Sequence, residues 1–387
     1  MEHSALFEAF KSVGNNLAQP ALSFSLAAVA LLLMLRLRRF AFNWWVGGLI
    51  LLAETAIIGF GMRDPNFRLI VGKPDNVPIT AMLFLSTIVL WLSMVQAVNN
   101  DRRAEQKLPP YEHETSHQKT WVWPDLLYIE FISLIICSVV LILWAIYLRA
   151  PLEQPANPAA TPNPSKAPWY FLGLQEMLVY YDPWYAGVVL PTIIIIGLMA
   201  IPYIDINPKG NGYFTFTERK MAITTFLIGY LALWVFMIIT GTFLRGPGWN
   251  FFGPFEYWDP HKVVALNNVN LSDYVWIVWL KKGLPEVKNV VPQLIPPDMH
   301  SISAFLHEVG QACKKEFAGL LFLAFYFLAM PGILAKTLMR KLYAQLDFMR
   351  FSVTVLLFLT MFTLPLKMVL RWTINLKYFV DTPWIKF

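Results

Sequence analysis

The strongest constraint on this chain is a set of eight apolar segments, each long enough to cross a lipid bilayer. A transmembrane helix needs about 20 mostly apolar residues. The segments lie at residues 20–35, 41–62, 79–98, 126–148, 186–203, 221–244, 317–335 and 351–370. Their apolar character is too continuous for the alternating strands of a membrane barrel. The sequence therefore predicts an all-α integral membrane bundle of about eight transmembrane helices.

Composition excludes several other classes of protein. Of the 387 residues, 57% are hydrophobic and only 14% are charged, whereas soluble domains carry about 25% charged residues. The two cysteines, Cys137 and Cys313, form neither a disulfide framework nor a haem-attachment motif. The net charge of +6 includes no run of five basic residues, so a nucleic-acid partner is not expected.

Loop charges predict the orientation of the bundle. Lysine and arginine are about twice as dense in one set of alternating loops as in the remaining loops and tails, and basic residues favour the cytoplasmic side. The basic set comprises residues 36–40, 99–124, 204–220 and 336–350. We therefore expect the N-terminus outside. The two long connections, 149–185 and 245–316, then lie on the outer face, where long loops usually carry function.

The first long connection contains a proline-rich tract and then an aromatic segment. Proline fixes φ and removes a backbone donor, so residues 151–168 should be extended. Residues 169–182 are expected to form a helix at the outer membrane interface, with Trp169 and Glu176 on one face. A carboxylate among aromatic rings suits a general base that takes a proton from a lipid-soluble hydroxyl compound. The alternative is an aromatic anchor beside a solvated glutamate.

Two acidic residues fall inside predicted spans. Glu54 lies near the middle of the second span and Glu130 a short way into the fourth. Ionisable groups at such depth are functional candidates by default, which suggests a proton relay. The alternative for Glu54 is a hydrogen bond at a helix contact, and Glu130 could simply reach the interface. A transporter using both acids would normally show an inverted repeat, and the sequence shows none.

No histidine lies within a predicted span. The six histidines are His3, His113, His117, His261, His300 and His307. A b-type haem held between membrane helices needs histidine ligands inside the spans. We therefore expect no haem ligated by this chain and no other metal site.

Several motifs in a fixed order carry a family resemblance. They are Glu153-Gln-Pro-Ala-Asn-Pro158, Thr161-Pro162, Trp169-Tyr170-Phe171, Gly187-Val-Val-Leu-Pro191, Ile201-Pro-Tyr-Ile-Asp205 and Arg219-Lys220. In these motifs and in its span spacing, the stretch from Pro124 to Leu244 resembles the C-terminal half of cytochrome b, called subunit IV where it is a separate chain. The segment around Lys166 is similar to bacterial, often menaquinol-oxidising, members.

The resemblance divides the chain into four regions. Residues 1–123 would be a three-helix N-terminal membrane extension, and residues 124–245 the domain resembling the cytochrome b C-terminal half. Residues 246–316 would form a loop region on the outer face, and residues 317–387 a C-terminal two-helix membrane region. The family members it resembles imply a multi-pass protein of the bacterial cytoplasmic membrane.

The resemblance also implies a quinol site on the positive side of the membrane. In the family, a Pro-Glu-Trp-Tyr motif lines this site, and its glutamate takes a proton from quinol. The matching positions here are Ala167, Pro168, Trp169 and Tyr170. Pro168 therefore stands where the family has its acid. Either Glu176 takes over that role as the catalytic residue, or the pocket formed with Pro168, Trp169 and Tyr170 is not catalytic.

The expected function is that of a haem-free membrane subunit in a cytochrome bc-type quinol:cytochrome c oxidoreductase. The resemblance implies three protein partners besides membrane lipid: a haem-b-bearing cytochrome b N-terminal subunit, a Rieske-type iron–sulfur protein and a c-type cytochrome. Haem b, haem c and the iron–sulfur cluster would belong to these partners, the substrate would be menaquinol, and the isolated chain should be inactive. The alternative is a structural scaffold subunit of a larger respiratory complex, with a non-catalytic quinone pocket.

Overall fold

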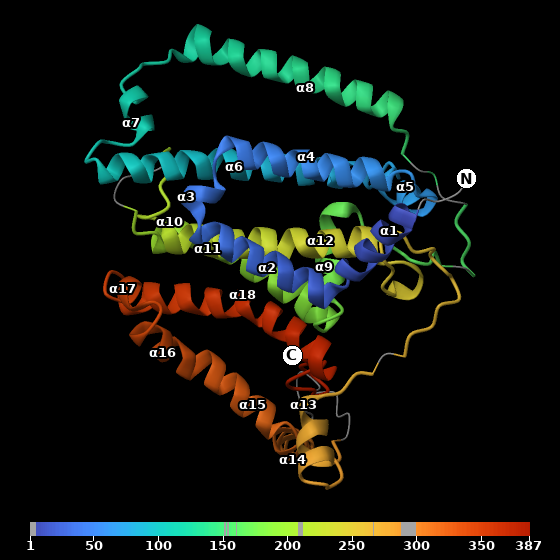
Figure 1. Ribbon diagram of the computed structural model, residues 1–387. Coiled ribbons are helices and arrows are strands. Elements are labelled where there is room, and N and C mark those ends of the chain that lie inside the picture. The colour runs from blue at the N-terminus through green and yellow to red at the C-terminus, as the bar shows by residue number, and fades with distance from the viewer. Residues whose placement is uncertain are drawn as a thin grey trace. The chain divides into compact units, whose positions relative to one another are not determined.

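A computed structural model describes residues 5–150, 152, 155–159, 161–207, 212–265, 267–287 and 299–387, without the side chains of residues 115 and 299–304. Within these residues the chain is helical, with isolated bridges in place of strands (Figure 1). Seven helices are long and apolar enough to cross a membrane: Trp44–Gly61, Val77–Glu105, Val122–Tyr147, Tyr185–Ile204, Lys220–Leu244, Phe317–Lys336 and Phe348–Ile374. The all-α membrane bundle predicted from the apolar segments is confirmed.

The first predicted span is one arm of a bent pair. Helix α1 (Ala5–Leu17) and helix α2 (Pro20–Arg36) meet at 83°, and counting them as one span gives eight. The bend follows from Pro20, which cannot donate to the preceding turn and holds Gln19 in an extended conformation, at ψ 129°.

The described chain forms two compact units. The first comprises residues 1–173 and 209–263, and the second comprises residues 174–208 and 264–387. In the first unit, α2, α3 (Arg38–Ala41), α4 (Trp44–Gly61) and α6 (Val77–Glu105) surround a core that includes Phe42 and Trp91. The segment from α11 (Lys220–Leu227) to α12 (Phe236–Ile239) completes this core through residues such as Leu227.

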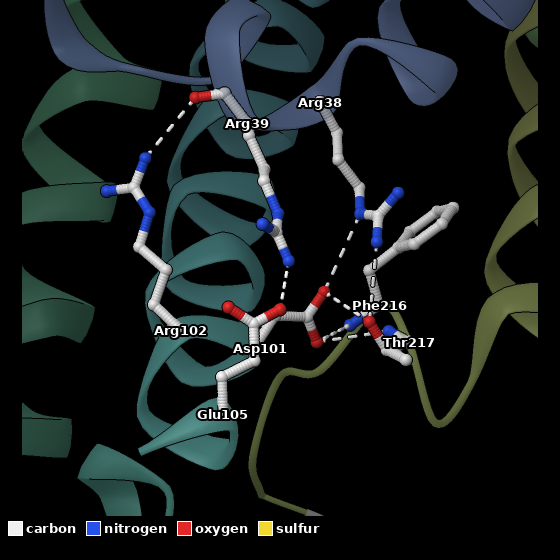
Figure 2. Close-up of polar contacts among 7 residues, drawn as sticks. All are labelled: Arg38, Arg39, Asp101, Arg102, Glu105, Phe216 and Thr217. Atoms are coloured by element: carbon white, nitrogen blue, oxygen red, sulfur yellow. Dashed lines mark hydrogen bonds and ion pairs between the residues drawn. The ribbon is translucent and has the colours of Figure 1, made fainter.

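The N-terminal extension is joined to the loop before α11 by two adjacent polar residues at the end of α6. Asp101, 5% exposed, accepts hydrogen bonds from Phe216 N at 3.2 Å, Thr217 N at 3.0 Å and Thr217 Oγ1 at 2.8 Å (Figure 2). The Arg38 Nε atom lies 3.6 Å from Asp101 Oδ2, and its guanidinium covers the Phe216 ring at 4.6 Å. Asn100 Nδ2 donates to the Phe214 carbonyl at 2.8 Å.

These contacts explain why a charged residue is buried at the end of a membrane helix. A buried carboxylate is tolerated when donors satisfy its oxygens, and Asp101 has three donors and a cation. The neighbouring Arg39–Glu105 pair in Figure 2 is more than half exposed on both sides, so it contributes little to stability.

Helix α8 (Leu127–Tyr147) differs from the other spans of the first unit. None of its residues is buried against the rest of the described chain. A helix that is apolar on all sides and unburied requires lipid or another protein chain around it.

In the second unit, α10 (Leu190–Ile204) packs on α18 (Phe348–Ile374). The unit also contains α13 (Leu271–Asp273), α14 (Met299–Lys315), α15 (Phe317–Ala324), α16 (Met330–Lys336) and α17 (Arg340–Tyr343). The segment after α18 returns along α15, where Gly319 permits close backbone approach. A Cβ at Gly319 would lie 1.8 Å from the Phe379 carbonyl oxygen. Helix α14 lies within the connection 245–316, which the sequence indicated only as a loop region.

The helix expected over residues 169–182 is much shorter in the structure. A single turn at Trp169–Phe171 leads into α9 (Leu172–Met177), and the chain then turns. Lys377 explains this early end, because its Nζ donates to the carbonyls of Leu178 and Val179, each at 2.9 Å. The proline tract before Trp169 contains no helix in its described residues, as predicted.

Lys377 gives the second unit a measurable pH dependence. Burial, and to a smaller extent the nearby positive charge of Arg371, lowers the pKa of Lys377 to about 8. The carboxylate of Asp182 opposes this shift. The folded state therefore binds the proton less tightly than the unfolded chain, and stability should rise between pH 8 and the ordinary lysine pKa of 10.5. We expect the thermal midpoint in detergent to rise more between pH 7.5 and 9.5 for the wild type than for Lys377→Met. Equal rises would contradict this assignment.

Candidate functional site

The first unit contains a cavity of about 820 Å³ at the segment that follows the proline tract. Its walls come from four stretches of chain, within residues 66–78, 144–150, 164–172 and 256–258. All four belong to connections or span ends that the loop charges assign to the same face of the membrane. Pockets for small ligands usually measure about 300–1,000 Å³, so this cavity has room for an aromatic ring of quinone size.

The N-terminal extension supplies one wall through helix α5 (Pro65–Val71) and the turn after it. Asp64 begins α5 by accepting hydrogen bonds from Asn66 N at 2.9 Å and Phe67 N at 3.1 Å. Such N-caps fix where a helix starts. Asp64 is 2% exposed, and the Lys11 Nζ atom of α1 lies 3.3 Å from its carboxylate. This network sets the position of α5 and of its cavity-lining residue Leu69.

Trp169 is placed by close packing behind it. The Phe171 N–H donates to the Pro168 carbonyl at 2.8 Å and closes the single turn. Gly241 allows this turn to approach the span Lys220–Leu244 closely, and Gly173 packs against the same span. A Cβ at Gly241 would lie 3.2 Å from the Leu172 carbonyl oxygen, and one at Gly173 would lie 3.4 Å from Trp234 and Ile238.

The cavity combines aromatic and charged lining. Trp144, Trp169, Tyr257 and Trp258 contribute rings. Lys166 is held in the wall, because its Nζ donates to the Thr242 carbonyl at 2.7 Å and lies 4.6 Å from the centre of the Trp258 ring.

Two lysines and two carboxylates line the cavity. Lys73 and Asp75 form an ion pair of 3.2 Å with each other, while Lys166 is held by the Thr242 carbonyl. Glu256 accepts a hydrogen bond from Gly253 N at 3.0 Å. This lining can stack on an aromatic ring and accept or donate hydrogen bonds at its polar edge.

The structure brings together only some of the residues singled out from the sequence. Pro168 and Trp169 line the cavity, whereas Tyr170 does not and is 51% exposed. The Tyr170 ring packs against Trp169 and Phe171 instead. Glu176 belongs to the second unit, is 1% exposed, and is absent from the cavity lining. Its catalytic role stays a prediction.

The two acids in the spans have different surroundings. Glu54 Oε1 accepts a hydrogen bond from Thr87 Oγ1 at 2.7 Å, which joins α4 to α6. The alternative interpretation of Glu54, a hydrogen bond at a contact between helices, predicted a contact of this kind. Glu130 is exposed in the first turn of α8. A relay through either acid stays a prediction.

Comparison with known families assigns one segment of the chain. Residues 155–243 match the family described as cytochrome b(C-terminal)/b6/petD. This segment is a cytochrome b C-terminal domain. It covers about a quarter of the 387 residues and includes Pro168, Trp169 and Tyr170. The match confirms the resemblance to the C-terminal half of cytochrome b and, with the apolar spans, supports a membrane subunit of cytochrome b-type respiratory electron transport.

No solved structure matches the chain. Among the described residues, no three histidine, cysteine, aspartate or glutamate side chains gather as metal ligands. The two compact units do not coincide with the family match. The cytochrome b C-terminal segment, residues 155–243, contributes to both units. The four regions expected from the sequence therefore stay a prediction.

Sequence reasoning missed the part of the cavity wall at residues 256–258. The signal was an acid between aromatic residues, in the run Phe255-Glu-Tyr-Trp258. This run lies more than 80 residues from Trp169, and nothing in its own pattern indicates that the two segments meet.

Proposed function

We propose that this chain is the haem-free membrane subunit of a cytochrome bc-type quinol:cytochrome c oxidoreductase, and that the cavity at Trp169 forms part of its quinol oxidation site. The observation that carries the proposal is the cavity itself. It is lined by Trp169, from within the cytochrome b C-terminal segment, and by three further aromatic rings. A quinol ring would stack against these side chains, and its hydroxyl groups would face the polar lining.

The redox centres of the reaction would belong to partner subunits. The spans of this chain contain no histidine, so they lack the ligands for a b-type haem. The proposed partners are a haem-b-bearing cytochrome b N-terminal subunit, a Rieske-type iron–sulfur protein and a c-type cytochrome, with menaquinol as substrate and the bacterial cytoplasmic membrane as location. This chain would bind the quinol and orient its hydroxyl groups toward proton acceptors.

Purification of the native complex tests this function. We expect quinol:cytochrome c reductase activity in the purified complex, with haem-b and iron–sulfur subunits identified beside this chain by mass spectrometry. The isolated chain should show no activity. A complex that lacks an iron–sulfur protein and does not oxidise quinol would instead favour the structural scaffold.

The predicted role of Glu176 has its own test. If Glu176 takes the quinol proton, Glu176→Gln should lower quinol oxidation more than tenfold while the complex still assembles. Assembly is checked by the amount of this chain in the purified complex. An unchanged rate in the assembled variant would remove Glu176 from the mechanism.

A further inference from the structure

The turn at residues 253–256 presents a carboxylate to the cavity. The Glu256 N–H donates to the Gly253 carbonyl at 3.1 Å, and the Gly253 N–H donates back to Glu256 Oε2 at 3.0 Å. These reciprocal hydrogen bonds fix the side chain relative to the turn. The other carboxylate oxygen, Oε1, has no hydrogen-bond or ion-pair partner among the described residues.

The N-terminal extension holds this turn in place. The Asn15 Oδ1 atom of α1 accepts a hydrogen bond from Phe255 N at 3.0 Å. A Cβ at Gly253 would lie 2.4 Å from the same oxygen, so only glycine permits this approach. Phe255 is 7% exposed and stacks on Phe67 of α5, with ring centres 5.0 Å apart. The turn is therefore anchored to both α1 and α5.

Of the two carboxylates that line the cavity, Glu256 is the one without an ion-pair partner among the described residues. Asp75 is paired with Lys73 at 3.2 Å. Lys166 is held by the Thr242 carbonyl at 2.7 Å. Pro168, at the start of the Trp169 turn, has no acid–base chemistry. A ligand with an acidic hydroxyl group in this cavity therefore has one uncompensated carboxylate to which it can donate.

We propose that Glu256 is the proton-accepting catalytic residue of the cavity, a role that rests on the proposed quinol oxidation. In the step we infer, one quinol hydroxyl donates to the free carboxylate oxygen, the quinol O–H bond breaks and a carboxyl O–H bond forms. The quinol is left as its monoanion, which becomes the quinone by losing one electron to an iron–sulfur centre and one to a haem, both on partner subunits, and its second hydroxyl proton to water. Because Glu256 is exposed, its proton can pass to water. The N-terminal extension is thus a positioning element for the acid.

The test compares acid-to-amide substitutions in the assembled complex. General-base catalysis contributes about 10²–10⁴-fold to a rate, so Glu256→Gln should lower quinol oxidation at least tenfold, and Glu256→Asp should restore part of the rate. Asp259→Asn is the matched control. Asp259 lies three residues further along the same loop, does not line the cavity, and accepts from His261 N at 2.9 Å through an oxygen that asparagine keeps. This control should retain the wild-type rate.

A second readout separates proton transfer from folding. The loss in Glu256→Gln should lie in kcat at an unchanged KM, because the variant still binds quinol, and Asp259→Asn should keep the wild-type kcat. Azido-quinone labelling of the cavity should persist in Glu256→Gln. An assembled Glu256→Gln complex with more than half the wild-type rate overturns the role of Glu256. If the wild-type complex itself does not oxidise quinol, the proposed function fails instead.

Discussion

The kcat/KM for quinol oxidation by the assembled complex should fall more than tenfold when Trp169 is replaced by alanine. The indole ring is the part of the cavity wall that the cytochrome b C-terminal segment itself supplies. Alanine would remove most of the apolar contact with a bound ring, and an aromatic pair contributes about 0.5–1.5 kcal/mol beyond the effect of the area that it buries. Steady-state rates measured over a range of quinol concentrations should show the loss mainly as a raised KM.

Trp121→Ala provides the control for this substitution. Trp121 is 70% exposed, precedes α8 and does not line the cavity. It should therefore retain the wild-type rate and KM. If Trp169→Ala assembles and oxidises quinol as well as Trp121→Ala, the cavity at Trp169 is not where quinol reacts, and a scaffold role becomes the better account.

The second large effect concerns stability. Asp101→Ala should destabilise the chain by about 3 kcal/mol, because it leaves the buried Phe216 N–H unsatisfied, removes the hydrogen bonds from Thr217 and leaves Arg38 without its carboxylate. The expected result is a drop of several degrees in the midpoint of thermal unfolding in detergent.

Glu105→Gln is the matched control, since it removes a carboxylate one helical turn from Asp101 on α6. Its partner is Arg39, and both side chains are more than half exposed. Exposed ion pairs contribute about 1 kcal/mol or less, so the midpoint should change little. Equal, small shifts in the two variants would show that the Asp101 contacts do not hold the loop before α11.

The membrane fold could be predicted from sequence because each span is a local property. Apolar length alone located every span later found in the structure. One detail that failed depends on a residue distant in sequence. The helix after Trp169 ends early because Lys377, about 200 residues away, donates hydrogen bonds to the carbonyls of Leu178 and Val179. The bend at Pro20 was readable in principle, because proline cannot continue a hydrogen-bonded turn.

The candidate site was only partly predictable for the same reason. Pro168 and Trp169 were found through their resemblance to a family motif, and both line the cavity. The opposite walls come from α5 and from the turn at Glu256, neither of which has a matching motif in the sequence. Their convergence depends on packing, such as that of Phe255 on Phe67, and packing between distant segments leaves no pattern in either one.

Photoaffinity labelling shows directly whether quinol binds in the cavity at Trp169. The purified complex would be illuminated with an azido-quinone, and labelled peptides of this chain would be identified by mass spectrometry, with excess unmodified quinol as competitor. We expect label, displaced by the competing quinol, on the peptides that contain Trp169 and Tyr257. Label confined to other parts of the chain, or label that quinol does not displace, would contradict it.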